Sequence, residues 1–127
     1  MFHVLVVDDN VINLKLVCDL LECAGIEVSR AEDAQSARSA LESLRPNLVL
    51  MDIGLPDMNG LELTRRLRAE ARFRTLPIIA LTAFAMKGDD RKAFEAGCNG
   101  YITKPIDTRT FVKQIEHFLQ SGPGPQQ

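Results

Sequence analysis

The sequence lacks several features that mark whole classes of protein. No apolar run approaches the length of a membrane-spanning helix, and the opening MFHVLVV is too short and uncharged for a secretory signal. The formal net charge is only −2, so neither a basic nucleic-acid-binding surface nor an electrostatic membrane contact is expected. A length of 127 residues suits one domain, which we expect over residues 1–120. The remaining SGPGPQQ (121–127) is typical of a flexible tail or the start of a linker.

Cysteine is also scarce, and its spacing matches no metal site. Cys18, Cys23 and Cys98 are an odd number without a C-x-x-C pair, which predicts packed, reduced thiols in a cytoplasmic protein. The histidines His3 and His117 have no potential ligand partner nearby in the sequence. A zinc site is therefore not expected.

What the sequence does contain is an alternation of two hydrophobic patterns. Short continuous apolar runs, typical of parallel strands covered on both faces, alternate with longer segments of helical spacing. The predicted strands are residues 2–7, 26–29, 48–51, 78–81 and 101–103. The predicted helices are residues 11–24, 33–44, 61–71, 87–96 and 108–119. Asn10 and Asn59 are expected to cap helix starts, and Gly25 and Gly97 to cap helix ends. Five β–α units predict an α/β sandwich of three layers, with a parallel sheet in the middle.

Polar side chains stand where the predicted strands end. Asp8 and Asp9 follow the first strand, and Asp52 follows the third. Thr82 ends the fourth strand, and Lys104 follows the fifth. Ligands of open parallel sheets bind beyond the carboxyl ends of the strands. If the first and third strands are neighbours, the three carboxylates share one crevice there.

Such a crevice is electrostatically unfavourable without cations. Three ionised carboxylates repel one another, whereas Lys104 and one divalent cation together balance their charge. Oxygen ligands with room for water and phosphate suit Mg²⁺, or else Mn²⁺. A carboxylate beside such a metal can attack phosphorus, with Lys104 and Thr82 holding phosphoryl oxygens. Taken singly, an Asp pair is more often a turn or cap, and most lysines are solvated; the convergence of four strands carries the prediction.

The segments VLVVDDN, LVLMDIGLPDMNG, PIIALTA and GYITKPID resemble the successive motifs of the receiver domain of two-component response regulators, over residues 2 to about 119. The resemblance implies a flavodoxin-like (βα)5 fold with strand order 2-1-3-4-5, as in the chemotaxis member of the family. A single-domain regulator of the cell-cycle type is one form that the family takes. A receiver cut from a hybrid kinase or a longer regulator stays an open alternative.

The resemblance also implies roles for individual residues. Asp52 would accept a phosphoryl group from a phosphohistidine of a sensor histidine kinase or a histidine phosphotransfer protein. Asp9, Asp52 and the backbone carbonyl of Gly54 would bind Mg²⁺ directly, and Asp8 would act through a bound water. Thr82 and Lys104 would hold the phosphoryl oxygens.

The same resemblance implies a switch. Tyr101 would turn inward when Thr82 moves, and this would change the surface of the fourth helix, fifth strand and fifth helix, where a downstream protein or a second copy binds. The domain would then be a monomer or a phosphorylation-dependent dimer. The Lys104–Pro105 peptide bond would be cis. Gly54 offers no side chain to orient a hydrolytic water and Phe84 is bulky, so we expect slow loss of the phosphoryl group.

Two other functions fit these residues less well. A phosphohydrolase that forms an aspartyl phosphate would carry Asp-x-Asp after its first strand and a cap insertion, whereas this strand ends in Asp8–Asp9–Asn10 and has no such insertion. A flavin-binding flavodoxin would need a Ser/Thr/Gly-rich first loop to hold a phosphate, whereas Asp8 and Asp9 would repel a phosphate in the absence of a metal.

The arginine-rich segment RRLRAEARFR (65–74) could suggest nucleic-acid binding. It is interpreted as a solvated helix face, because Glu70 interrupts it and no set of aromatic side chains for base stacking accompanies it.

Overall fold

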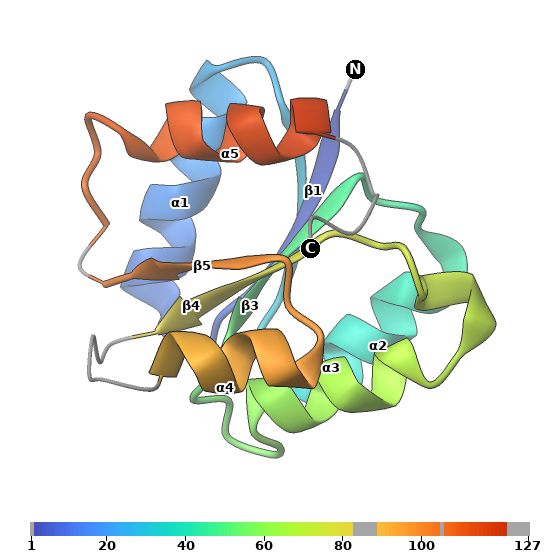
Figure 1. The fold of residues 1–127 in the computed structure, drawn as a ribbon. Coiled ribbons are helices and arrows are strands. Elements are labelled where there is room, and N and C mark those ends of the chain that lie inside the picture. The colour runs from blue at the N-terminus through green and yellow to red at the C-terminus, as the bar shows by residue number, and fades with distance from the viewer. Residues whose placement is uncertain (1, 83–88, 105, 122–127) are drawn as a thin grey trace.

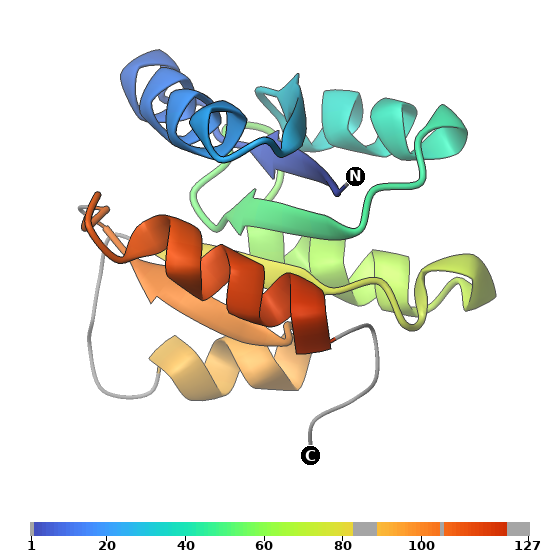
Figure 2. The ribbon, with the colours of Figure 1, turned by 90° about the horizontal axis from the view of Figure 1, so that it is seen from above.

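A computed structural model describes residues 2–82, 89–104 and 106–121 of the chain. Five strands form one sheet between two layers of helices (Figures 1 and 2). The strands are β1 His3–Val7, β2 Glu27–Ala31, β3 Leu48–Asp52, β4 Ile78–Thr82 and β5 Gly100–Thr103. The helices are α1 Val11–Cys23, α2 Ala34–Ser43, α3 Gly60–Arg68, the short 3-10 helix η1 Ala71–Phe73, α4 Asp89–Ala96 and α5 Phe111–Ser121. The predicted three-layer α/β fold is confirmed.

The sheet is parallel throughout and has the order β2-β1-β3-β4-β5. The predicted order 2-1-3-4-5 is therefore correct, and β1 and β3 are neighbours. In the register, Val7 pairs with Met51 and Thr82 with Thr103, so all the strands end at one edge. Because this edge brings together the residues that follow β1, β3 and β5, the fold itself assembles the candidate site.

Two apolar cores lie on opposite faces of the sheet. Inward-facing side chains alternate along each strand: Leu5 and Val7 join the core under α2, α3 and α4, whereas Val4 and Val6 join the core under α1 and α5. All five residues of β3 and of β4 are buried, which is why both strands read as continuous apolar runs. The sheet is therefore covered by helices on both faces, and the places left for a ligand are at the ends of its strands.

Local signals determined most of the element boundaries. Asn10 and Asn59 cap α1 and α3 through their side-chain oxygens, as predicted. Gly25 and Gly97 follow α1 and α4 with φ of 82° and 110°, the left-handed conformation expected at helix ends. In contrast, α5 begins at Phe111 and not at residue 108, because Asp107 holds residues 108–110 in a turn through the bond from Arg109 N to its carboxylate.

Two expectations about side chains need correction. Cys18 and Cys98 are buried free thiols as predicted, but Cys23 is exposed because it lies on the outer face at the end of α1. The arginine-rich segment is not one solvated helix face, since α3 ends at Arg68 and η1 follows. Arg68 is half-buried and donates hydrogen bonds to the Gly97 and Phe73 carbonyls at 2.9 and 2.6 Å.

No helix in the described part of the chain has the length and apolar character needed to cross a membrane.

Candidate functional site

The three predicted carboxylates meet at the carboxyl edge of the sheet. Asp8 and Asp9 leave β1, and Asp52 is the last residue of the neighbouring β3. One oxygen from each lies within 4.8 Å of the other two. Asp8 is fully buried and Asp52 nearly so, whereas Asp9 is exposed. The cluster therefore opens to solvent on the side of Asp9, where a ligand can enter.

Lys104 is the cation that the structure places against this cluster. Its ammonium nitrogen lies 3.2 Å from Asp8 Oδ2 and 3.3 Å from Asp52 Oδ1. The backbone N–H of Lys104 donates to the Thr82 carbonyl at 2.7 Å, which fixes the residue to the end of β4. One ammonium group bridges two carboxylates, so the described cluster keeps an excess of negative charge.

The carboxylate of Asp8 is held on both of its oxygens. The backbone N–H of Asn10 donates to Oδ1 at 2.9 Å, and the side-chain amide of Asn13 donates to Oδ2. Asn13 lies in the first turn of α1, whose start is fixed by the Asn10 cap. The helix thus orients a carboxylate that is already buried, which leaves Asp8 little freedom to move.

The environment of Asp52 opposes its ionisation. Burial raises the pKa of the Asp52 carboxyl, and the negative charge of Asp8 raises it further. The ammonium group of Lys104 and a hydrogen bond from Gly54 N, at 3.2 Å, lower the same pKa but do not cancel the rise. A cation added to the cluster would relieve this repulsion, which is the condition that a metal site needs.

The loop after Asp52 is folded tightly against the end of β3. Gly60 N donates to the Ile53 carbonyl at 2.8 Å, and a Cβ atom at Gly60 would collide with the Asp52 carbonyl. Gly54, in contrast, has no atom within 4 Å of its would-be Cβ. Glycine is therefore required at 60 by close approach of the backbone, and Gly54 has open space around it.

A second contact fixes the same loop to α2. The carboxylate of Asp57 accepts hydrogen bonds from Ala34 N at 2.9 Å and from Gln35 N at 3.0 Å. Asp33 caps the next amide, Ser36 N, at 2.7 Å. The first three amides of α2 are thus all satisfied by carboxylates, and two of these bonds tie the helix to the loop that carries Gly54.

Thr82 and Tyr101 lie on adjacent strands on the α4 side of the sheet. Tyr101 pairs with Ala80 in the register, so Thr82, two residues further on, faces the same side. Thr82 is buried, whereas Tyr101 is 39% exposed. The Tyr101 ring meets Phe94 of α4 edge to face, with the centroids 6.3 Å apart. Pro105 and Phe84, for which a cis bond and a shielding role were expected, lie outside the described residues, as does the tail from 122 onward.

Four structural residues were missed in the sequence. Asn13, Asp57 and Arg68 are polar residues whose partners are distant in the chain or buried, so no local pattern indicates their contacts. Gly60 did carry a signal: a glycine inside the first turn of a helix weakens it and suggests that space is short.

The family model described as the response regulator receiver domain matches residues 4–116. The chain is 43% identical over 116 residues to the polar-differentiation response regulator DivK of Brucella anthropi, which covers 91% of this chain and 94% of that protein. The DivK protein of Brucella ovis is 42% identical over 116 residues, which again cover 91% of this chain and 94% of that protein.

Solved structures agree with the sequence relatives. A receiver domain of the sensor histidine kinase PA1611 from Pseudomonas aeruginosa, described with a magnesium ion coordinated in the active site cleft, matches with a TM-score of 0.85 and 33% identity, over 94% of this chain and 98% of that one. The chemotaxis response regulator CheY4 of Vibrio cholerae matches with a TM-score of 0.87 and 27% identity, over 93% and 98% of the two chains.

Proposed function

The chain belongs to the response regulator receiver domains of two-component phosphorelay systems, and we propose that Asp52 is its phosphoacceptor. The observation that carries this proposal is the position of Asp52 at the end of β3, with its carboxylate 3.3 Å from the Lys104 ammonium and beside two further carboxylates. In the transfer, an Asp52 oxygen forms a bond to phosphorus while the bond from phosphorus to the histidine nitrogen of the donor breaks. The donor is a sensor histidine kinase or a histidine phosphotransfer protein.

We propose that the acidic cluster binds Mg²⁺, with Mn²⁺ as the alternative. The donor set fits: three carboxylates with oxygens within 4.8 Å, an excess of negative charge and one exposed member. Asp9, Asp52 and the Gly54 carbonyl would hold the ion directly, and Asp8 would act through water. When bound, the metal neutralises phosphoryl oxygens that would otherwise be repelled by the carboxylates.

Two residues of this chain would bind the transferred group. The Lys104 ammonium, already at the cluster, would pair with one phosphoryl oxygen and exchange part of its contact with Asp52. The Thr82 hydroxyl would donate to another oxygen, since Thr82 ends the strand beside β3. With these roles the domain would be a phosphoacceptor that assists its own phosphorylation and dephosphorylation, and not an aspartyl-phosphate phosphohydrolase.

The signal would leave through the surface of α4, β5 and α5. Movement of Thr82 toward the phosphoryl group would open space on the α4 side of β4, and Tyr101 is the half-exposed ring on the adjacent strand. Its turn inward would break the contact with Phe94 and change the surface that a downstream protein or a second copy recognises. The three free cysteines accord with a cytoplasmic location.

Phosphorylation with a small donor tests the central assignment. Incubation with Mg²⁺ and acetyl phosphate or phosphoramidate is expected to add one phosphoryl group, seen by intact-protein mass spectrometry. Asp52→Asn should add none, and Asp9→Asn should weaken Mg²⁺ binding measured by calorimetry. Asp19→Asn, which alters an exposed carboxylate of α1 outside the cluster, is the matched control. A normal yield in Asp52→Asn would reject the phosphoacceptor assignment.

The switch and the lifetime each have a separate test. Amide chemical shifts with beryllofluoride, which mimics the phosphoryl group, should change at Tyr101 and α4 as well as at the loop after Asp52. Changes confined to that loop would reject the switch.

Gly54→Asn should speed hydrolysis of the aspartyl phosphate, because the open space at Gly54 accepts a side chain that can orient water. Loss of the wild-type phosphate within seconds would contradict the expected slow hydrolysis.

A further inference from the structure

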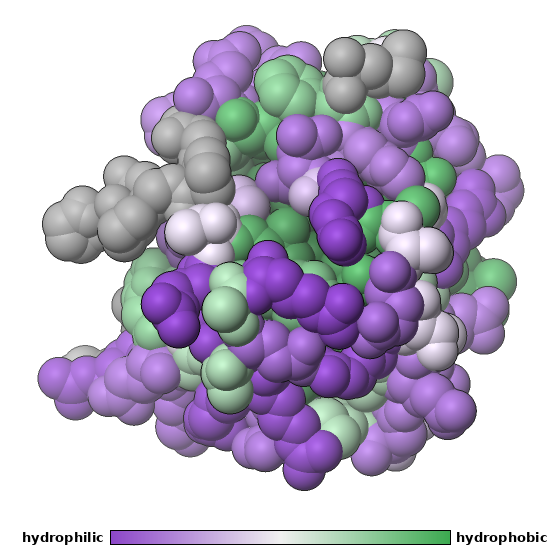
Figure 3. Space-filling view, turned by 90° about the vertical axis from the view of Figure 1, so that its right-hand side faces the viewer, coloured by the Kyte–Doolittle hydropathy of each residue, from purple (hydrophilic) through white to green (hydrophobic). Residues whose placement is uncertain are grey.

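A cavity of about 260 Å³ lies at the opposite edge of the sheet, where β3 and β4 begin. Figure 3 views this side of the molecule and shows apolar side chains in a hollow that is ringed by hydrophilic ones. The end of α2, the chain that leads into β3, and the segment from η1 to β4 form its walls. The apolar lining residues are Leu41, Leu44, Pro46, Phe73, Leu76 and Pro77. None of the residues proposed for phosphoryl transfer takes part.

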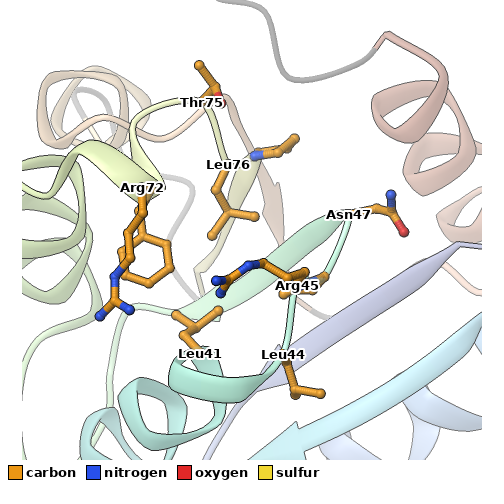
Figure 4. A pocket seen from close by; sticks show the side chains of 10 residues that line it. Leu41, Leu44, Arg45, Asn47, Arg72, Thr75 and Leu76 are labelled. Carbon is orange, nitrogen blue, oxygen red and sulfur yellow. The ribbon is translucent and has the colours of Figure 1, made fainter.

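The two arginines that line this cavity have different surroundings. Arg72 is fixed: it forms hydrogen bonds with both oxygens of Glu42, at 3.2 and 2.8 Å, and with Glu70 at 3.2 Å. Its guanidinium also lies 4.6 Å from the centroid of the Phe73 ring. Arg45 is exposed, and among the described residues no group forms a hydrogen bond or ion pair with its guanidinium. In Figure 4 the Arg45 side chain extends between Leu41 and Leu76 toward Arg72.

We propose that this cavity binds a compact hydrophobic carboxylate, that is, an aryl or branched-alkyl group of about ten heavy atoms that carries one carboxylate. The apolar floor would take the hydrocarbon part, and the guanidinium of Arg45 would pair with the carboxylate in its planar, two-pronged geometry. The volume is below the usual range for drug-sized ligands, which limits the occupant to a small molecule.

The surrounding charges argue against larger anions. Glu42 and Glu70 lie beside Arg72 and neutralise it, so only one cation of the cavity is open to a ligand. A nucleotide or polyphosphate would bring several negative charges against these two carboxylates. A single carboxylate is the anion that this arrangement can balance. The proposal does not depend on phosphorylation of Asp52.

Titration of the ¹⁵N-labelled full chain with 3-phenylpropanoate tests the proposal. Saturable amide shifts are expected at Leu41, Leu44, Arg45 and Leu76, with a dissociation constant of about 1 mM. Arg45→Gln should weaken binding roughly tenfold by removing the charge-assisted bond. Arg74→Gln is the matched control, because Arg74 is an exposed arginine between η1 and β4 that does not line the cavity.

Two further ligands separate the proposal from its alternatives. The neutral 3-phenylpropanol should bind much more weakly than the acid. Equal binding of the alcohol, unchanged binding to Arg45→Gln, or the absence of saturable shifts at the cavity would overturn the proposal. A pentapeptide that ends in phenylalanine with a free carboxylate provides the last comparison: tighter binding of this peptide than of the free acid would assign the cavity to a protein chain end and reject the small-molecule assignment.

Discussion

Charged side chains gather at both ends of the central sheet, but each carboxylate is matched by its own arginine only in the cluster at the amino end. At the carboxyl end three carboxylates share one ammonium group, that of Lys104. At the amino end Arg38 and Arg72 pair with two carboxylates. These carboxylates belong to Glu42 and Glu70. Excess charge is thus kept where a metal and a phosphoryl group are proposed to bind, whereas charges that only join α2 to the connection between α3 and β4 are matched.

The pKa shifts at the two ends have opposite signs for this reason. Burial and the repulsion of Asp8 raise the pKa of Asp52. Hydrogen bonds from Arg38 and Arg72 lower the pKa values of Glu70 and Glu42, respectively. A lowered carboxyl pKa contributes stability at neutral pH, and a raised one reduces stability there. The functional end is therefore expected to weaken the fold in the absence of its ligands.

The largest expected effect comes from crowding the carboxyl end. Gly60→Ala would force the new Cβ atom into the Asp52 carbonyl and should lower the free energy of unfolding by about 3 kcal/mol. It should also slow phosphorylation, because the strand end that carries Asp52 must shift. Gly54→Ala is the matched control: it meets no atom within 4 Å and should unfold at nearly the wild-type urea concentration. Equal stability of the two variants would show that the loop can relax.

The next effect belongs to the amino end. Arg68→Met should cost about 2 kcal/mol of unfolding free energy, because it removes the guanidinium bond to the Gly97 carbonyl and leaves the Phe73 carbonyl only the longer bond from Leu76 N. Arg66→Met, on the same helix, removes only an exposed pair with Glu62 and should change little. Urea unfolding of both variants measures the difference. If Arg66→Met cost as much as Arg68→Met, burial of the guanidinium would not be the cause.

A smaller effect of opposite sign is expected at Asp52. Without metal, Asp52→Asn should stabilise the domain by about 1 kcal/mol at neutral pH, because it removes a buried negative charge and its repulsion with Asp8. The Asp52 pKa is raised in the folded state. Between this raised pKa and the ordinary value of 3.8, the folded protein therefore binds more protons than the unfolded chain does. The wild type recovers stability as pH falls through this window, and the gain from Asp52→Asn should shrink there. A constant gain between pH 7 and pH 4 would contradict the repulsion.

The smallest effect is expected from the matched charges. Arg72→Gln should lower the urea midpoint only slightly, since exposed ion pairs contribute little. The loss should fade as pH falls through the lowered pKa values of Glu42 and Glu70, because protonation of these carboxyls removes the pairing in the wild type as well. Arg74→Gln provides the reference for a change of net charge alone. A loss that persisted at low pH would point to packing of the Arg72 side chain on Phe73.

The fold and the cluster of site residues were predictable from the sequence because both follow from strand ends. Continuous apolar runs located β3 and β4, and parallel pairing then brings Asp8 and Asp52 to one edge. The order of the strands came from family resemblance and not from the pattern itself. The contacts of Asn13, Asp57 and Arg68 could not be predicted, since each joins segments whose relative placement only the folded chain defines.

The bonds that Ala34 N and Gln35 N donate to Asp57 make two amides of α2 into natural probes of the loop after Asp52. Ala34 N and Gln35 N are held by a carboxylate that belongs to the loop, whereas the neighbouring Ser36 N is held by Asp33, just before the helix. Exchange of these protons for solvent deuterium depends on release of those bonds. If the loop rearranges around an occupied site, the first two amides should exchange at a new rate while the Ser36 amide keeps its own. The first turn of α2 therefore contains two amides that report on the loop and a third, Ser36 N, that serves as their internal reference.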